Sequence, residues 1–331
     1  MYNYKNKNIG IIGLGITGRS AINFFSNYSR KIIGWDDSKT IRSNIVEGNI
    51  EILDLNIVKN LKLIDLLFIS PGIKPNHKII KLAKINNINI VGDIDIFWQK
   101  EEKNKNRFIF VTGSNGKSTV TSLIHHLLIS AKINSIIGGN IGVPVLSLNS
   151  KKKPNIYVIE ASSFQLNSAK KIKPNISVLT NISPDHIDWH GNYKNYINAK
   201  ENLFLNQDES DLAIINIDSE ECFKLYKRIN KRLIKPKIIK ISLNKKLRNT
   251  IYVDGEKVYD NINNKNIFIG RIRDLSSLLG NHNIENTVIA IAAAIHEGVT
   301  HEQIRKFLPS FKGLSHRLEL IYKDSNIEFI N

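Results

Sequence analysis

The sequence predicts an α/β fold with parallel sheets, arranged in at least two consecutive domains. Strand-like and helix-like segments alternate along the chain, and this alternation is typical of parallel sheets covered by helices. Two glycine-rich turns, at residues 13–18 and 113–116, each follow a strand-like run and precede a helix-like run. The chain has 331 residues and no internal repeat, and this length is more than one ordinary core requires.

The first domain is expected to open with a strand at residues 9–12, the turn Gly13-Leu-Gly-Ile-Thr-Gly18 and a helix that includes Phe24 and Phe25. Asp36 follows the next strand, about 20 residues on, so the turn fits the dinucleotide-binding pattern of Rossmann-like domains. That pattern alone favours a nicotinamide-dependent oxidoreductase. A glycine turn recognises a pyrophosphate and not a nicotinamide, however, so another diphosphate ligand is the alternative. The remaining elements expected in this domain are strands at 31–34, 66–70 and 88–91 and a helix at 78–86.

The second glycine turn lies in Val111-Thr-Gly-Ser-Asn-Gly-Lys-Ser-Thr119 and predicts a phosphate site. It connects an expected strand at 107–111 to an expected helix at 118–131. Backbone N–H groups and the helix N-terminus would hold phosphates, Lys117 would reach the outer phosphates, and Ser118 or Thr119 would bind Mg²⁺. Only two residues separate its glycines, where the general phosphate loop has four, so this is a shorter variant. The alternative is an ordinary turn before a helix.

Polar side chains follow the next expected strands, at 156–159 and 176–179. Glu160 ends the first of them and is either a Mg²⁺ ligand or a solvated acid. The segment from Asp185 to His190 is dense in possible ligands in a predicted loop, but no cysteine lies nearby to favour zinc. Histidines in a loop most often have no ligand role. The alternative is that one of these histidines contributes to a Mg²⁺–nucleotide site. Lys200, in an expected helix start at 196–204, resembles any surface lysine.

The rest of the chain predicts a loop at 100–106, a hairpin at 251–259 around Asp254-Gly255 and a helix at 281–298. Strands are expected at 317–322 and 327–331, as the beginning of a further domain. We expect domains at 1–94 and 95–312, with 313–331 opening a truncated C-terminal domain.

Composition excludes several classes of partner. The net charge of +17 comes from lysines spread along the chain, often between isoleucine and asparagine, and no aromatic-plus-basic RNA signature is present. We therefore expect no nucleic-acid partner. No apolar run is long enough for membrane insertion, and the start lacks the apolar core of a signal peptide. The single cysteine, Cys222, excludes an internal disulfide and suits the cytoplasm.

Six motifs occur in the order in which the Mur ligase family carries them, and the chain resembles that family over its whole length. They are Thr112-Gly-Ser-Asn-Gly-Lys-Ser-Thr119, Glu160-Ala-Ser-Ser-Phe-Gln165, Thr180-Asn-Ile-Ser-Pro-Asp-His186, Ala199-Lys200, Leu279-Gly-Asn-His-Asn283-Ile-Glu-Asn286 and Gly313-Leu-Ser-His-Arg317. The short phosphate loop is similar to the family's own. The turns at 13–18, 70–73 and 138–142 look like those of the branch that adds D-glutamate.

The resemblance implies a set of site residues. Lys117, His186 and Lys200 would be catalytic, and Lys200 matches the lysine that the family carbamylates. The Mg²⁺ sites would involve Ser118, Glu160, His186 and Lys200. The UDP-sugar substrate would contact Ile16, Thr17, Asp36, Asp37, Gly72 and Asn140. ATP would contact Gly113, Ser114, Asn115, Gly116, Lys117, Ser118, Thr119, Asn283, Asn286 and Arg317.

The activity that the resemblance implies is an ATP- and Mg²⁺-dependent ligation in peptidoglycan precursor synthesis. A monomer would join D-glutamate to UDP-N-acetylmuramoyl-L-alanine through an acyl phosphate. The family's third domain supplies further contacts, and the chain ends at Asn331 where they would begin. We therefore also consider a non-catalytic nucleotide-binding remnant. A folylpolyglutamate-type ligase is a further alternative, against which the first-domain glycine turn argues, and the nicotinamide oxidoreductase is the last.

Overall fold

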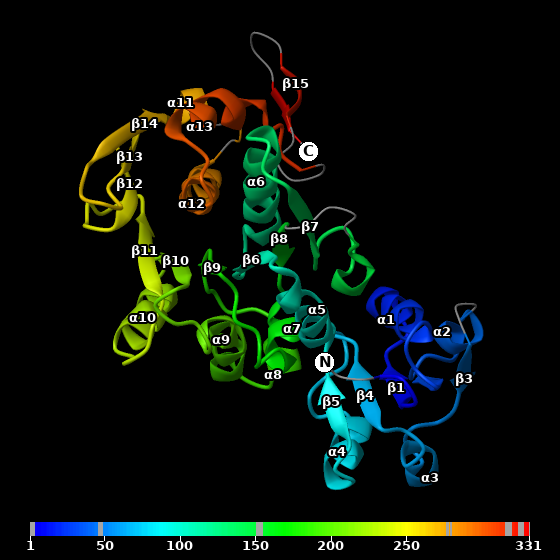
Figure 1. The fold of residues 1–331 in the computed structure, drawn as a ribbon. Helices are drawn as coiled ribbons and strands as arrows, with labels where there is room; N and C mark the ends of the chain where they lie inside the picture. Colours follow the sequence, from blue (N-terminus) through cyan, green and yellow to red (C-terminus); the bar gives the residue numbers. More distant parts are fainter. Residues whose placement is uncertain are drawn as a thin grey trace.

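The protein folds into two domains built on parallel sheets and connected through helix α5 (Asp93–Glu101) (Figure 1). The computed structural model describes residues 4–45, 49–149, 155–275, 278, 280–314, 320–323 and 328–330. The predicted α/β class with parallel sheets is confirmed. Among the described residues, no helix is both long and apolar enough to cross a bilayer.

The first domain contains a parallel sheet with helices along it. In the described residues its strand order is β3 (Ile50–Ile52), β2 (Lys31–Trp35), β1 (Asn8–Ile12), β4 (Leu66–Ile69) and β5 (Asn89–Val91). The chain order departs from the spatial order at β1, where β2 lies on one side and β4 on the other. Ligands of such sheets bind at the carboxyl ends of the strands beside this switch point. The helices are α1 (Ile16–Ser26), α2 (Lys39–Ser43), α3 (Val58–Leu61) and α4 (Lys78–Ile85).

The central domain contains a larger mixed sheet. In the described residues its order is β14 (Ile267–Arg271), β13 (Lys257–Asp260), β12 (Thr250–Asp254), β11 (Lys237–Ser242), β10 (Leu212–Asn216), β9 (Ile176–Leu179), β6 (Arg107–Thr112), β8 (Ile156–Glu160) and β7 (Ser135–Gly139). The strands from β12 to β7 are parallel, and β13 and β14 are antiparallel additions at one edge. The predicted hairpin around Asp254-Gly255 is the β12–β13 pair.

Helices cover both faces of the central sheet, and strand alternation decides which side chain meets which layer. In β6, Phe108 and Phe110 belong to one core cluster, whereas Ile109 and Val111 belong to the other. Such fully apolar strands are typical of parallel sheets that are buried on both sides. The helices are α6 (Lys117–Ser130), α7 (Ser163–Ser168), α8 (Ile187–His190), α9 (Tyr193–Glu201), α10 (Glu220–Asn230), α11 (Ile272–Leu275), α12 (Asn281–His296) and α13 (His301–Phe307).

Helix α5 joins the two domains into one core. Its Phe97 and Trp98 pack on Phe108 of β6, and Phe97 also contacts Tyr157 of β8. The prediction of a loop over residues 100–106 is partly wrong, because α5 continues to Glu101 and a 3₁₀ turn follows at Glu102–Asn104. The apolar face of α5 is buried between the domains. This burial stabilises the helix through its charged C-terminal turn. Residue 94, where we expected the boundary, lies inside this helix.

Two other sequence expectations need correction, and a third is confirmed. Lys200 lies in the last turn of α9, which begins at Tyr193, and not at a helix start. Asn192 caps that helix through its side chain, which accepts a hydrogen bond from the Asn195 N–H. The segment from Ile187 to His190 is a short helix and not a loop. The two terminal strands expected at 317–322 and 327–331 are confirmed as the antiparallel pair β15 (Leu320–Lys323) and β16 (Glu328–Ile330), and the turn between them lies outside the described residues.

Candidate nucleotide and ligation site

The predicted phosphate loop forms as expected between β6 and α6. Its backbone is held by the segment that follows β9: the Ser114 N–H donates to the Asn181 carbonyl at 2.9 Å, and the Asn115 N–H donates to Asn181 Oδ1 at 2.9 Å. Thr180 Oγ1 donates to the Asn115 carbonyl at 2.6 Å. The loop is therefore fixed before any ligand arrives, and ligand binding would not bear the cost of ordering it.

Lys117 starts α6 and bends back over the loop. Its Nζ donates to the Ser114 carbonyl at 2.7 Å, which keeps the ammonium group at the loop where a phosphate would lie. Ser118 and Thr119 occupy the first turn of the same helix and are nearly buried. The arrangement provides one cation, two hydroxyl groups and a helix N-terminus at one point, as an anion site requires.

Gly116 is required by both its backbone and its surroundings. Its φ is +79°, in the left-handed region, and a Cβ there would lie 2.2 Å from Asn286 Oδ1. Asn286 and Asn283 extend from the first turns of α12, where Asn286 Nδ2 donates to Asn283 Oδ1 at 3.2 Å. The structure thus brings two predicted adenine-side residues to the phosphate loop. Arg317, which we expected to contact the nucleotide as well, lies outside the described residues.

Replacing Gly116 by alanine is expected to lower the free energy of unfolding more than the same change at Gly191. Both glycines have similar positive φ values, +79° and +81°, so the backbone cost of alanine, about 1–2 kcal/mol, is shared. A Cβ added at Gly191 would meet no other part of the chain within 4 Å, whereas one at Gly116 would meet Asn286. The extra cost at Gly116 should be about 1 kcal/mol or more. Urea unfolding of both variants measures the difference. Equal losses of unfolding free energy would show that the Asn286 side chain moves aside at no cost.

Glu160 is buried at the carboxyl end of β8, next to β6. The residue is 2% exposed, so the alternative of a solvated acid is wrong. Oε1 accepts a hydrogen bond from Asn140 Nδ2 at 2.9 Å, while Oε2 is buried without a hydrogen-bond partner among the described residues. A buried carboxylate oxygen without a partner is costly. Asn140, which we expected at the UDP-sugar, belongs to this central site, and its backbone N–H also donates to the Glu160 carbonyl.

Lys200 is buried against the phosphate loop, contrary to its interpretation as a plain surface lysine. It is 1% exposed, and its Nζ donates to the Gly113 carbonyl at 2.6 Å. Burial lowers the pKa of Lys200 to about 7, and the charge of Lys117 adds to the effect. An amine with such a pKa is partly neutral at physiological pH, and a neutral amine can react as a nucleophile.

Tyr196 is a site residue that sequence reasoning missed. Its ring lies 4.5 Å from Lys200 Nζ, and its hydroxyl lies 2.7 Å from Ser114 Oγ. Ser114 Oγ already donates to the Ser183 carbonyl, so the Tyr196 hydroxyl is the donor in this pair. Burial raises the pKa of Tyr196 to about 12, which keeps that proton in place. The spacing of Tyr196 and Lys200, four residues apart on a helix, is the signal that could have indicated it.

Removing the Tyr196 hydroxyl with Tyr196→Phe is expected to cost about 1 kcal/mol of unfolding free energy. The phenylalanine keeps the ring under Lys200 and removes only the hydrogen bond to Ser114. Chemical denaturation of the variant, with Tyr193→Phe on the same helix as the control, measures the loss. Identical curves for Tyr196→Phe and the wild type would remove this hydroxyl from the support of the loop.

The two histidines of the predicted ligand-rich segment have different environments. The His186 side chain is half exposed and lies 3.4 Å from Asp185, and its ring contacts Phe164. His190 is buried, with Nε2 3.0 Å from Ser163 Oγ. Burial, and secondarily the charge of Lys200, lower the pKa of His190 to about 4, so it is neutral. Among the described residues, no group of three or more His, Cys, Asp and Glu side chains is close enough to hold a metal ion by itself.

In the first domain, the predicted glycine turn is tied to the end of β2. Asp36 Oδ2 accepts the Leu14 N–H at 2.8 Å and Oδ1 accepts the Ser38 N–H at 2.9 Å, so this carboxylate fixes the turn itself. Asp37 lies 3.0 Å from His77 Nε2, and this hydrogen bond is the main cause that lowers the pKa of Asp37. Ile16 is 78% exposed at the start of α1.

The two halves of the candidate site face each other across the domain boundary. Trp189 Nε1 donates to the Gly72 carbonyl at 3.3 Å, and Phe164 and Trp189 line a narrow hollow together with Ser70, Pro71 and Ile73 of the first domain. The expected UDP-side turn at Gly72 is therefore in contact with the helices that follow Glu160. Thr17 lies in the first turn of α1, beside Ile16.

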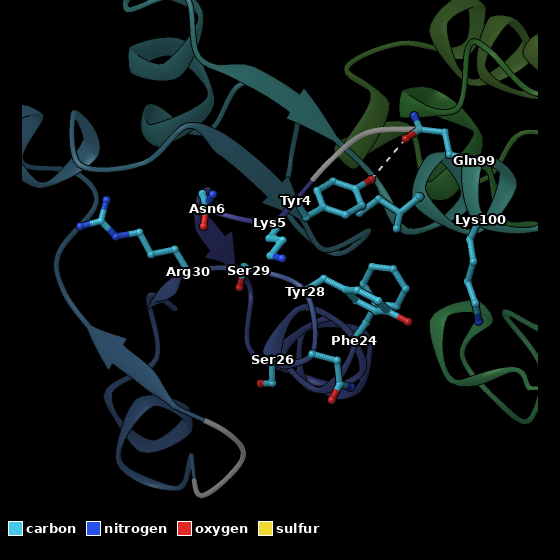
Figure 2. A pocket seen from close by; sticks show the side chains of 12 residues that line it. Tyr4, Lys5, Asn6, Phe24, Ser26, Tyr28, Ser29, Arg30, Gln99 and Lys100 are labelled. Carbon is cyan, nitrogen blue, oxygen red and sulfur yellow. Dashed lines mark hydrogen bonds between the residues drawn. The ribbon is translucent and has the colours of Figure 1, made fainter.

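A larger cavity of about 560 Å³ lies elsewhere, where the N-terminal segment, the end of α1 and α5 meet (Figure 2). Tyr4 reaches across it, and its hydroxyl donates to Gln99 Oε1 at 3.2 Å. Phe24 and Tyr28 form an aromatic wall. None of the predicted site residues lines this cavity, so size alone does not identify the nucleotide site.

Comparisons with known proteins place the chain in a family. Residues 111–294 match the Mur ligase middle domain, and residues 7–92 match the N-terminal domain described as Mur ligase MurD-like. The chain belongs to the Mur ligase family.

Among its relatives, the UDP-N-acetylmuramoylalanine–D-glutamate ligase of Rickettsia prowazekii is 37% identical over 99% of this chain and 72% of its own length. The ligases of the same name from Rickettsia felis and Caulobacter vibrioides are 38% and 33% identical, over 72% and 71% of their own lengths.

Solved structures share the fold at lower identity. The UDP-N-acetylmuramate:L-alanyl-γ-D-glutamyl-meso-diaminopimelate ligase from Neisseria meningitides superimposes with a TM-score of 0.63 at 18% identity, covering 94% of this chain and all of that one. The UDP-N-acetylmuramate–alanine ligase from Thermotoga maritima gives a TM-score of 0.56 at 19% identity, covering 98% of this chain and 74% of that one. These likenesses confirm the α/β architecture.

Proposed function

We propose that this chain catalyses the ATP-dependent addition of D-glutamate to UDP-N-acetylmuramoyl-L-alanine, a step of peptidoglycan precursor synthesis. The observation that carries the proposal is the convergence of the phosphate loop, the buried Glu160 and the buried Lys200 in a chain 31–38% identical to ligases of that name. The cytoplasm is the proposed compartment, because the lone thiol of Cys222 stays reduced there.

The proposed nucleotide site extends from the phosphate loop to α12. Residues 113–119 would hold the phosphates of ATP, and Asn283 and Asn286 would lie on its adenine side. The UDP-sugar would lie against the first-domain turn near Ile16, Thr17, Gly72, Asp36 and Asp37. Of the two aspartates, Asp36 also fixes the turn. Trp189 and Phe164 connect the two parts, since they contact the first domain beside Gly72.

The residues present suit Mg²⁺. Glu160 Oε2 is a buried acceptor without a protein partner in the described residues, and Ser118 lies in the first turn of α6 beside the loop, so both supply the oxygen ligands that this ion prefers. A carbamate on Lys200 would add a further anion at the same end of the sheet. His186 would lie at the margin of this Mg²⁺ site. When bound, Mg²⁺ would neutralise phosphate charge.

The chemistry then follows from positioning and charge. The L-alanyl carboxylate attacks the γ-phosphorus of ATP, an O–P bond forms, and ADP leaves. The amine of D-glutamate attacks the resulting acyl phosphate, the amide bond forms, and inorganic phosphate leaves with loss of the amine proton. Lys117 would stabilise negative charge that develops on the transferred group, and the prearranged loop would align it.

Ligand preference of the first domain tests the proposal against the oxidoreductase alternative. Saturation-transfer NMR should detect UDP-N-acetylmuramoyl-L-alanine and give little signal with NADH, because the chain carries separate phosphate turns in its two domains. Thr17→Ala should weaken the UDP-sugar signal, and Thr40→Ala, in α2, is the control. Tight NADH binding without a UDP-sugar signal would overturn the assignment.

A further inference from the structure

One segment of the central domain concentrates positive charge beyond the general lysine content of the chain. Residues 222–253 contain 11 lysines and arginines and no aspartate or glutamate, whereas the whole chain has 47 basic and 30 acidic residues. A compositional bias toward lysine adds cations everywhere, but it does not remove acids from one stretch. The segment covers most of α10, strand β11 and most of β12.

The centre of this segment is an exposed aliphatic turn. Leu233 and Ile234, between α10 and β11, are 96% and 65% exposed. Lys231, Arg232, Lys235 and Lys237 surround them in the sequence. We call residues 227–237 the basic tip. Burying large aliphatic side chains is favourable, so an exposed pair at the apex of a charged turn indicates a contact surface.

Most of the neighbouring acids are already engaged by a subset of the cations. Glu201 binds Arg228 at 2.7 Å and Arg232 at 3.2 Å, and Glu220 and Glu221 bind Lys224. Within the described part of the chain, neither Lys231 nor Lys237 has a carboxylate within 4.0 Å. Glu209 lines the same pocket as Lys235 and Lys237 but forms no ion pair with either within the described residues, so the tip keeps an excess of positive charge.

The basic tip and the nucleotide site lie at opposite ends of the parallel strands of the central sheet. The phosphate loop follows β6 at the carboxyl ends of the parallel strands, whereas the tip precedes β11 and so lies at their amino ends. Helix α10 and β11 also lie toward the opposite side of the central domain from β7 and the first domain (Figure 1). A partner could therefore cover the tip without covering the phosphate loop.

We propose that the basic tip docks on the surface of an anionic lipid bilayer. Leu233 and Ile234 would enter the boundary between headgroups and acyl chains, and Lys231 and Lys237 would contact lipid phosphates. The apex is aliphatic and carries no aromatic side chain, so it lacks the stacking platform that single-stranded nucleic acids use. The contact is peripheral and goes beyond the ligase function, on which it does not depend.

Vesicle sedimentation tests this proposal with the whole chain. The protein should pellet with vesicles of phosphatidylglycerol and phosphatidylcholine, much less with phosphatidylcholine alone, and less as salt rises. Changing Leu233 and Ile234 together to serine should weaken the partitioning by about tenfold or more. Lys231→Glu with Lys237→Glu should weaken it by about 25-fold or more, since each lysine contributes about fivefold.

Ile85→Ser is the matched control, because Ile85 is 75% exposed on α4 in the first domain and its loss should leave vesicle binding unchanged. Circular dichroism of each variant checks that the fold is retained. The proposal is overturned by failure to pellet with anionic vesicles, or by pelleting that neither tip variant reduces. Retention on RNA at the same salt without vesicle binding would also overturn it, in favour of a nucleic-acid partner.

Discussion

Replacing Lys117 by alanine is expected to weaken Mg²⁺–ATP binding by at least about tenfold. The ammonium group is held at the loop by the Ser114 carbonyl and would make a charge-assisted contact with phosphate. Such contacts contribute about 1.5–3 kcal/mol, which corresponds to a tenfold to hundredfold change in affinity. Isothermal titration of the wild-type and variant proteins with Mg²⁺–ATP measures the effect directly.

Lys59→Ala, on an exposed face of the first domain, is the control for general loss of positive charge and should leave ATP affinity unchanged. The Lys117 variant has a second expected consequence. Since the charge of Lys117 helps to lower the pKa of Lys200, that pKa should rise when Lys117 is removed. Equal ATP affinities in wild type and Lys117→Ala would remove Lys117 from the phosphate site.

The strand–turn–helix conformation around residues 113–116 was predictable because its signal is local. A strand, a glycine turn and a helix follow one another within residues 107–130, and apolar runs such as 107–111 and 156–159 need no distant partner to be recognised. The ends of helices were less predictable. Ser162 and Gln165 form a capping box that starts α7, and this signature was readable from the sequence although we did not use it.

The environment of Lys200 could not be predicted from its neighbours in the sequence. Its burial depends on contact with Gly113, which is 87 residues away in the chain. The same holds for Tyr196, whose hydroxyl meets Ser114 across 82 residues. Asp36 shows the opposite case, because its spacing correctly placed it at the glycine turn, but only the structure shows both its oxygens bound to backbone N–H groups.

The boundary helix α5 was missed for a physical reason. Residues 93–101 carry three acids and a lysine, so their local pattern has no clean apolar stripe. Asp93 is nevertheless buried, where Gln165 Nε2 donates to its Oδ2 at 2.7 Å, and burial raises the pKa of Asp93. Contacts between the domains therefore compensate for polar residues that sequence patterns assign to solvent.

Lys200→Ala is expected to reduce ligation by about 100-fold or more in the enzyme, because it would remove the proposed carbamate and its contact with the phosphate loop. Carbamate formation requires the neutral amine, which adds to CO₂ and loses a proton. Burial lowers the pKa of Lys200 from 10.5 to about 7, so the neutral fraction increases as pH rises through 7. Between pH 7 and 10.5 the unfolded chain binds more protons at this lysine, so its contribution to folding stability rises with pH across that window.

Two measurements separate carbamylation from a purely structural role of Lys200. Carbon-13 NMR with labelled bicarbonate should show a carbamate resonance in the wild type that is absent from Lys200→Ala, and its intensity should grow from about pH 6 to about pH 8. Short-chain carboxylates should restore part of the variant's turnover by supplying the missing anion. Lys194→Ala, an exposed lysine on the same helix, should keep the resonance and the activity. Normal turnover of Lys200→Ala would contradict the catalytic assignment. A wild-type protein without the carbamate resonance would show that the buried amine acts only as a structural donor to the Gly113 carbonyl.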